Sequence, residues 1–249
     1  MDSGHTTAIP SSLCGHSFLK TFPITIILLL LTAFPAASQR RVAVDVERKE
    51  VSGGKVTSTR KHVCCQSGGR LVSFVSYPDK YYVIEDASGG TFYLPGSNQY
   101  YTDRSGTFSG KDNLLNIFLS RAVFDMGLGQ FGYTLKSTET DPEGYLIRTF
   151  VTDKAGDTPV VELVFKDYLP VCMIYKSADG TLRGKVYLSD YRTVKRFVFP
   201  HRTTEVMYPN PKDSVVTRTI YSNLTVDEDD ELFDFSVPPD ARPVKMNKR

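Results

Sequence analysis

The stretch that decides the fold is Leu71-Val72-Ser73-Phe74-Val75-Ser76-Tyr77-Pro78-Asp79-Lys80-Tyr81-Tyr82-Val83-Ile84. It consists of two short runs of β-branched and aromatic residues on either side of Pro78 and Asp79, which favour a turn. Two such runs joined by a short turn are typical of antiparallel strands. The same alternation of short apolar runs and turn residues continues from Arg41 to Pro238. The sequence therefore predicts a mainly β fold.

Thirteen segments have the composition of strands, and tight turns separate many of them. Turn residues that accept a positive or fixed φ occur at Gly53-Gly54, Ser88-Gly89-Gly90, Asp141-Pro142-Glu143-Gly144 and Ala178-Asp179-Gly180. Because short turns join successive strands side by side, we expect one up-and-down meander. The predicted strands are Val42–Lys49, Lys55–Cys65, Arg70–Ser76, Lys80–Asp86, Thr91–Leu94, Gln99–Thr102, Tyr133–Thr140, Gly144–Thr152, Val160–Lys166, Val171–Lys176, Gly184–Tyr191, Arg202–Met207 and Ser214–Leu224.

One segment, Lys111–Met126, has the pattern of a helix. An apolar stripe follows the spacing of three and four residues that brings side chains to one helix face, and Gly127 and Gly129 follow the last turn. The stripe consists of Leu115, Phe118, Leu119, Ala122 and Met126. We expect this helix to cover the inner face of the sheet, either as a fixed part of the core or as a movable lid over a cavity.

The N-terminal segment predicts export. Lys20 precedes an apolar run, Phe22–Leu31, that is short for a membrane span, and Ala36 and Ser38 are the small residues that a signal peptidase requires. We therefore expect a signal peptide at residues 1–38, a mature chain that starts near Gln39, and a single domain at residues 39–249. The net charge of +2 gives no indication of nucleic-acid binding.

Cys64, Cys65 and Cys172 remain after the expected cleavage. An oxidising compartment favours a disulfide from Cys172 to Cys64 or Cys65, because neighbouring residues of a strand point to opposite faces and only one can meet a given partner. Three buried free thiols are the alternative, since cysteine is a common core residue.

No motif for catalysis, a metal or a cofactor is present. His62 and His201 lack metal-ligand spacing with other histidines, cysteines or carboxylates, and Cys64-Cys65 lacks the spacing of a metal site. There is no Gly-x-Ser-x-Gly nucleophile elbow, and the acidic run 227–231 lacks the spacing of a calcium loop, so a solvated turn is favoured there. We therefore expect a protein that is not an enzyme, with no cofactor and no metal.

The order of these segments resembles that found in the outer-membrane lipoprotein carrier (LolA/LolB-like) superfamily. The runs 71–84 and 89–101 resemble its early strands, and the helix falls where that family places helices. Later strands are similar at Val161–Pro170, Asp179-Gly180, Ser189–Tyr191, Phe199–Arg202, Tyr221–Leu224 and Leu232–Pro238. The resemblance implies a curved, half-open antiparallel sheet, an incomplete barrel covered by a short helical lid, with an apolar cavity that shields lipoprotein acyl chains in the periplasm.

The leading hypothesis is therefore a periplasmic, non-enzymatic carrier or chaperone for lipoproteins or other acylated cargo. The resemblance implies an inner-membrane transporter that releases the cargo and an outer-membrane acceptor as partners, and we expect a monomer. The alternative is an envelope sensor or scaffold that uses the same fold for protein–protein interaction. We expect the cavity to be lined by Phe74, Tyr81, Val83, Phe92, Leu94, Leu115, Phe118 and Leu119.

Overall fold

A computed structural model describes residues 40–86, 89–103, 114–154, 158–210 and 213–244. Contacts divide the chain into two units, Met1–Ser38 and Gln39–Arg249, and all that follows concerns the second unit. The predicted signal peptide lies outside the described residues. Within the described ranges, no helix is both long enough and apolar enough to span a bilayer.

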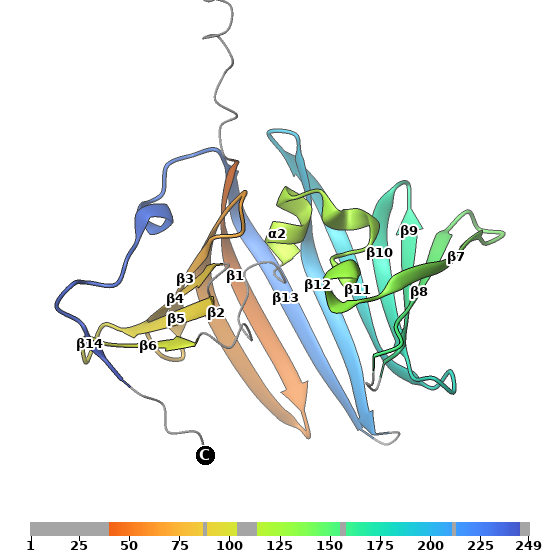
Figure 1. Ribbon diagram of the computed structural model, residues 1–249, viewed down its shortest axis with the longest axis horizontal. Coiled ribbons are helices and arrows are strands. Elements are labelled where there is room, and N and C mark those ends of the chain that lie inside the picture. The colour runs from red at the N-terminus through yellow and green to blue at the C-terminus, as the bar shows by residue number, and fades with distance from the viewer. Residues whose placement is uncertain (1–39, 87–88, 104–113, 155–157, 211–212, 245–249) are drawn as a thin grey trace, which may run out of the picture. The chain divides into compact units, whose positions relative to one another are not determined.

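The described part of the chain is mostly strand, and each strand predicted above overlaps one strand of the structure (Figure 1). The strands are β1 (Arg41–Ser52), β2 (Lys55–Gln66), β3 (Leu71–Tyr77), β4 (Tyr81–Asp86), β5 (Gly89–Leu94), β6 (Gln99–Asp103), β7 (Thr134–Thr140), β8 (Leu146–Val151), β9 (Val160–Lys166), β10 (Leu169–Lys176), β11 (Leu182–Val194), β12 (Phe197–Asn210), β13 (Asp213–Val226) and β14 (Arg242–Pro243). All belong to one sheet, in the order β14-β6-β5-β4-β3-β2-β1-β13-β12-β11-β10-β9-β8-β7.

The prediction of a single meander is wrong at the centre of the sheet. Strands β1 to β6 form one up-and-down run and β7 to β13 form a second. The two runs meet where β1 pairs antiparallel with β13, for example at Val46 and Tyr221. This pairing joins segments that are far apart in sequence, so no short turn in the sequence indicates that the two strands are neighbours. The first and last strands of the two runs therefore lie side by side in the middle of the sheet.

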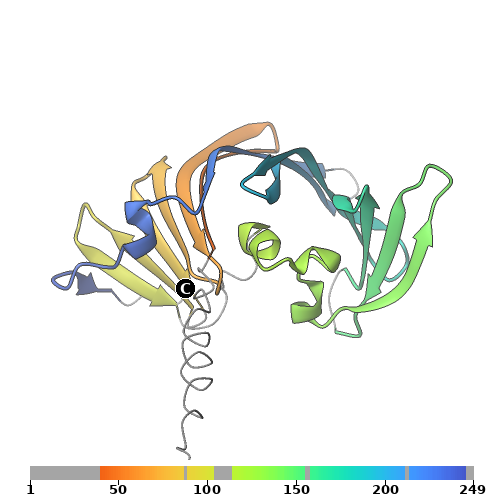
Figure 2. The same cartoon turned by 90° about the horizontal axis from the view of Figure 1, so that it is seen from above.

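The sheet is curved and open, as predicted. Its two edges are β7 and the two-residue β14, and they are not paired to each other. Figure 2 shows the sheet bending around the helical segment that follows β6. Residues of the concave face, such as Val44, Val63 and Leu163, form the main core with this segment. The concave face is therefore the inner, covered side of the fold.

The predicted helix is present only in part, because the described segment consists of one short α-helix followed by two 3-10 turns. They are α2 (Leu114–Leu119) and the 3-10 turns η2 (Ala122–Phe124) and η3 (Leu128–Phe131). The helix ends where the Ser120 hydroxyl donates to the carbonyl of Asn116 and Arg121 adopts a left-handed φ of 58°. A hydroxyl that bonds to the carbonyl four residues earlier often bends a helix. The predicted start, residues 111–113, lies outside the described residues.

The segment after β13 packs on the convex face. The 3-10 turn η4 (Glu231–Asp234) buries Leu232 and Phe233 against Ala43, Cys64 and Val72. Of the acidic run 227–231, for which a solvated turn was expected, only Asp230 is half-buried and the other four residues are exposed. The Asp230 carboxylate accepts a hydrogen bond from the Leu232 amide at 2.9 Å. Further along, β14 adds to the edge of the sheet by pairing parallel with β6.

Candidate functional site

The concave face contains a cavity of about 660 Å³ between the sheet and α2. This volume lies within the range of about 300–1,000 Å³ that is usual for small-molecule sites. Strands β1 to β5, strands β10 to β13 and helix α2 all contribute to its wall. The cavity therefore spans the junction of the two strand runs and depends on the β1–β13 pairing.

One part of the cavity wall is apolar. Leu114 and Leu115 extend from α2, and Met173, Val186 and Leu188 line the cavity from β10 and β11. On the other side the apolar wall continues through Val46, Val63, Val75, Tyr81, Val83 and Phe92. These residues alternate with outward-facing ones along their strands, because successive side chains of a strand point to opposite faces.

The other part of the wall is polar and opens to solvent. Arg48 of β1 pairs with Thr59 and Thr219 on its two neighbours, and Glu50 pairs with Thr57 and Thr217. The Arg48 guanidinium donates to Glu50 at 3.1 Å. Both Arg48 and Thr57 are exposed, so this end of the cavity is open to solvent. The site is therefore amphipathic, with an apolar part beside α2 and a polar mouth.

Two polar side chains lie between these parts. Lys61 faces the cavity, and burial lowers the pKa of its amine, although the negative charge of Glu85 opposes this shift. The Ser73 hydroxyl also lines the cavity and has no hydrogen-bond partner among the described residues. A buried hydroxyl without a partner costs free energy, so a polar group of a ligand would be stabilised there.

The structure brings four of the predicted cavity residues together. Tyr81, Val83, Phe92 and Leu115 line the cavity. Phe118 and Leu119 belong to the buried core of the same face but do not line the cavity, and the Phe118 ring lies 5.3 Å from that of Phe199.

The other two predicted residues lie elsewhere. Phe74 is on the convex face with Tyr82, because its strand neighbours Ser73 and Val75 point inward. Leu94 is 47% exposed at the end of β5. Sequence reasoning missed Arg48 and Glu50, although both share the inward parity of Val44 and Val46 along β1.

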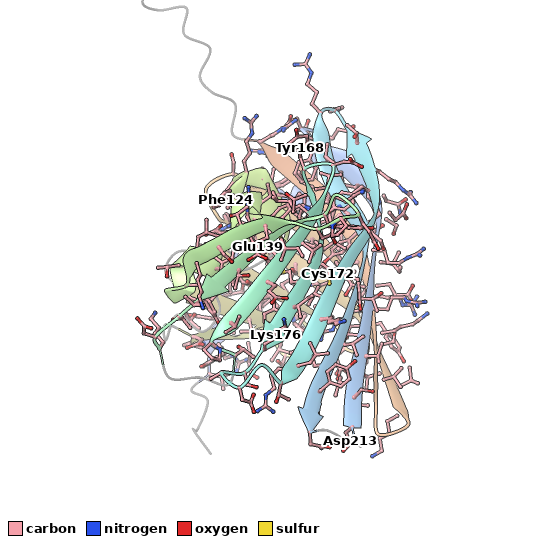
Figure 3. The ribbon with its side chains drawn as sticks, turned by 90° about the vertical axis from the view of Figure 1, so that its right-hand side faces the viewer. Phe124, Glu139, Tyr168, Cys172, Lys176 and Asp213 are labelled. Atoms are coloured by element: carbon pink, nitrogen blue, oxygen red, sulfur yellow. The ribbon has the colours of Figure 1, made fainter. Side chains whose placement is uncertain are left out.

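Cys64, Cys65 and Cys172 are free and buried, so the predicted disulfide is not formed. Five strand steps separate β2 from β10, where Cys172 lies (Figure 3). At about 4.8 Å a step this is about 24 Å along the sheet, far more than the roughly 7 Å that a disulfide can span between Cα atoms. The alternative of three buried thiols describes the structure.

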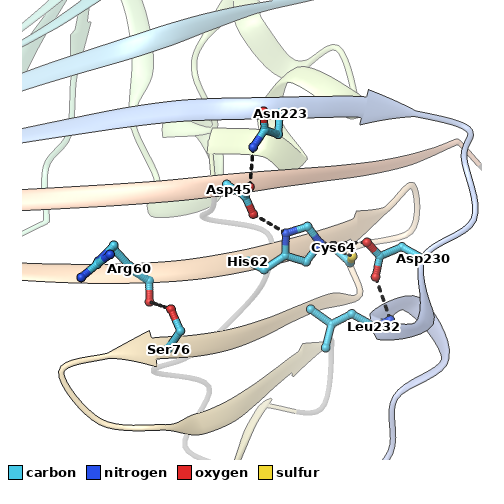
Figure 4. Close-up of polar contacts among 8 residues, drawn as sticks. All are labelled: Asp45, Arg60, His62, Cys64, Ser76, Asn223, Asp230 and Leu232. Carbon is cyan, nitrogen blue, oxygen red and sulfur yellow. Dashed lines mark hydrogen bonds and ion pairs between the residues drawn. The ribbon is translucent and has the colours of Figure 1, made fainter.

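A second cluster of functional groups lies on the convex face, around His62 (Figure 4). His62 Nδ1 is 2.6 Å from Asp45 Oδ1, and Nε2 is 2.8 Å from Asp230 Oδ2. The Cys64 sulfur lies 3.8 Å from the same Nε2. Burial lowers the pKa of His62, but the two carboxylates outweigh it and the pKa of His62 is raised. Burial raises the pKa of the Cys64 thiol, as does the negative charge of Asp230.

Comparisons with known proteins find similarity in structure alone. No protein-family model matches the chain, and no curated protein matches it in sequence. A LolA superfamily protein from Nitrosomonas europaea superposes with a TM-score of 0.51 at 12% identity, covering 76% of this chain and 86% of that one. A DUF1329 family protein from Desulfovibrio piger gives 0.50 at 15% identity, covering 77% of this chain and 87% of that one.

A third solved structure, described as an outer membrane lipoprotein-sorting protein domain from Vibrio parahaemolyticus, is also similar. Its TM-score is 0.53 at 11% identity, and the match covers 84% of this chain and 94% of that one. At such low identity the similarity concerns the fold alone. The protein has the LolA-like fold.

Proposed function

We propose that this protein is a periplasmic, non-enzymatic carrier or chaperone for lipoproteins or other acylated cargo. The observation that carries the proposal is the amphipathic cavity between α2 and the concave face, whose apolar wall suits an acyl chain. The lipoprotein-sorting description of a structural neighbour supports the same cargo class. Export in this proposal depends on residues 1–38, whose composition is that of a signal peptide.

The cavity suggests how the cargo would lie. The acyl chain would lie against Leu115, Val186 and Leu188, out of contact with water. The ester or amide that joins the chain to its head would lie near the Ser73 hydroxyl, and the hydrated head would reach the mouth at Arg48. An inner-membrane transporter and an outer-membrane acceptor would load and unload a monomeric carrier through this mouth.

Affinity is expected to rise with the length of the acyl chain. Each CH₂ that enters the apolar part contributes about 0.8 kcal/mol, which is about fourfold in Kd. Displacement of a fluorescent acyl probe by saturated fatty acids from octanoate to palmitate would measure this increment. We expect a steady gain followed by a plateau when the cavity is full. An affinity that does not change with chain length would contradict the proposal, since only the head would then be bound.

A further inference from the structure

We propose that His62, Cys64 and Asp230 bind a transition-metal ion, and that Zn²⁺ is the ion that fits them best. The three side chains offer an imidazole nitrogen, a thiolate sulfur and a carboxylate oxygen, the donor types that zinc uses in proteins. Their donor atoms all lie within 4.8 Å of one another. Three protein ligands leave one position of a tetrahedral shell for water or an external ligand.

The distances are close to those of a coordination shell. Zinc bonds of about 2.0–2.3 Å place neighbouring ligand atoms of a tetrahedron roughly 3.3–3.8 Å apart. The Cys64 sulfur and His62 Nε2 are 3.8 Å apart, which already matches. His62 Nε2 and Asp230 Oδ2 are 2.8 Å apart, so a side-chain shift of about half an ångström would open the space for the ion.

The surroundings of the three residues orient them as metal ligands. His62 Nδ1 is 2.6 Å from Asp45 Oδ1, and Asp45 itself accepts a hydrogen bond from Asn223 at 2.8 Å. A carboxylate that holds the far nitrogen of a ligating histidine fixes the tautomer and leaves the other nitrogen for the metal. The second oxygen of Asp230 accepts the Leu232 amide at 2.9 Å, which fixes that carboxylate in turn.

Two of the three ligands are partly open to solvent, because the side chains of His62 and Asp230 are 32% and 27% exposed. A hollow beside Asp230 is lined by Asp229, Glu231, Asp234 and one basic residue, Arg41. This excess of negative charge attracts cations and raises their local concentration. On binding, the thiol of Cys64 loses its proton to solvent, and so does Nε2 of His62 where it is protonated, while the proton on Nδ1 stays on the Asp45 side.

Metal binding would join two distant parts of the chain. His62 and Asp230 are 168 residues apart in sequence, on β2 and just before η4. An ion held by both would fasten the segment after β13 to the convex face. Because the ion binds only the folded arrangement, the unfolding temperature should rise with its concentration. This site is separate from the concave cavity, so its test does not depend on acyl binding.

Cobalt and zinc titrations of the purified, reduced and chelator-treated protein test the site. With Co²⁺ alone we expect thiolate-to-cobalt charge-transfer absorption that saturates at one ion per chain, and added Zn²⁺ should abolish it. Cys64→Ala should remove the absorption, whereas Cys65→Ala is a matched control, because the neighbouring thiol lies buried in the concave core and should leave the absorption intact. Asp45→Asn is expected to weaken zinc binding about 10- to 100-fold.

Two further measurements keep the test decisive if Cys64→Ala unfolds. Asp230→Ala keeps the thiol but should weaken zinc binding at least tenfold, and its folding is checked by circular dichroism. In the unmodified protein, Zn²⁺ should raise the unfolding temperature, whereas Mg²⁺, which prefers oxygen ligands, should not. Folded unmodified protein without cobalt charge transfer would overturn the proposal. So would absorption that survives in Cys64→Ala or disappears only in Cys65→Ala.

Discussion

Changing Phe118 to Asp is expected to lower the free energy of unfolding by about 4 kcal/mol or more. The Phe118 side chain on α2 is 7% exposed, and its ring lies 5.3 Å from Phe199 and 6.3 Å from Tyr191. A carboxylate there would be buried without a cationic partner, and the ring contacts would be lost. A domain of ordinary stability has about 5–15 kcal/mol in total, so the variant would be close to unfolding.

Urea denaturation of this variant also decides between the two roles that the sequence leaves open for the helical segment. Phe131→Asp is the matched control, because Phe131 lies on η3 of the same segment but is 48% exposed, and the expected change is within about 0.5 kcal/mol. If Phe118→Asp unfolds at the same urea concentration as the original protein, α2 swings out freely as a lid. That result would contradict the packed arrangement of Phe118 against Phe199.

Val186→Glu is expected to weaken the binding of a fluorescent acyl probe by at least about 100-fold. Val186 lines the cavity from β11 and lies directly across from Glu205 and Met173. A carboxylate at this place would have to lose its water when the chain enters, at a cost of several kcal/mol, and 1.4 kcal/mol is already tenfold in Kd. Val186 is only half-buried in the protein, so the fold should tolerate the change.

The control for this variant is Tyr187→Glu. Tyr187 is the next residue of the same strand, points to the opposite face and is 42% exposed. The substitution Tyr187→Glu introduces the same charge outside the cavity, so probe binding should be unchanged. Thermal unfolding of both variants shows whether each is folded. A folded Val186→Glu that binds the probe like the original protein would mean that acyl chains lie elsewhere.

The local pattern of the sequence predicts the strands well, because strand alternation and turn residues are properties of neighbouring residues. The central pairing of β1 with β13 could not be predicted in this way, since Val46 and Tyr221 meet only through the long return of the chain. The break in the helix occurs at Arg121, which adopts a left-handed φ of 58°. The apolar periodicity continues past this residue to Met126, so the pattern does not show the break.

The sequence predicts only part of the candidate site, because local patterns do not show which strands lie side by side. Val83 and Phe92 line the cavity, as expected, but Phe74 lies on the convex face, because a shift of one residue along a strand moves a side chain to the other face. Arg48 and Glu50 are not among the predicted lining residues, because only apolar and aromatic side chains were assigned to the cavity. The cluster around His62 could not be found, because Asp230 is distant in sequence.

The central claim is that the concave cavity carries an acyl chain, and lipid mass spectrometry of the protein isolated under native conditions from its own cell envelope tests it most directly. The account predicts that acylated species co-purify with the protein in about equimolar amount and are lost from Val186→Glu but kept by Tyr187→Glu. Protein that is folded and contains no acyl species, with or without a stable protein partner, would contradict it.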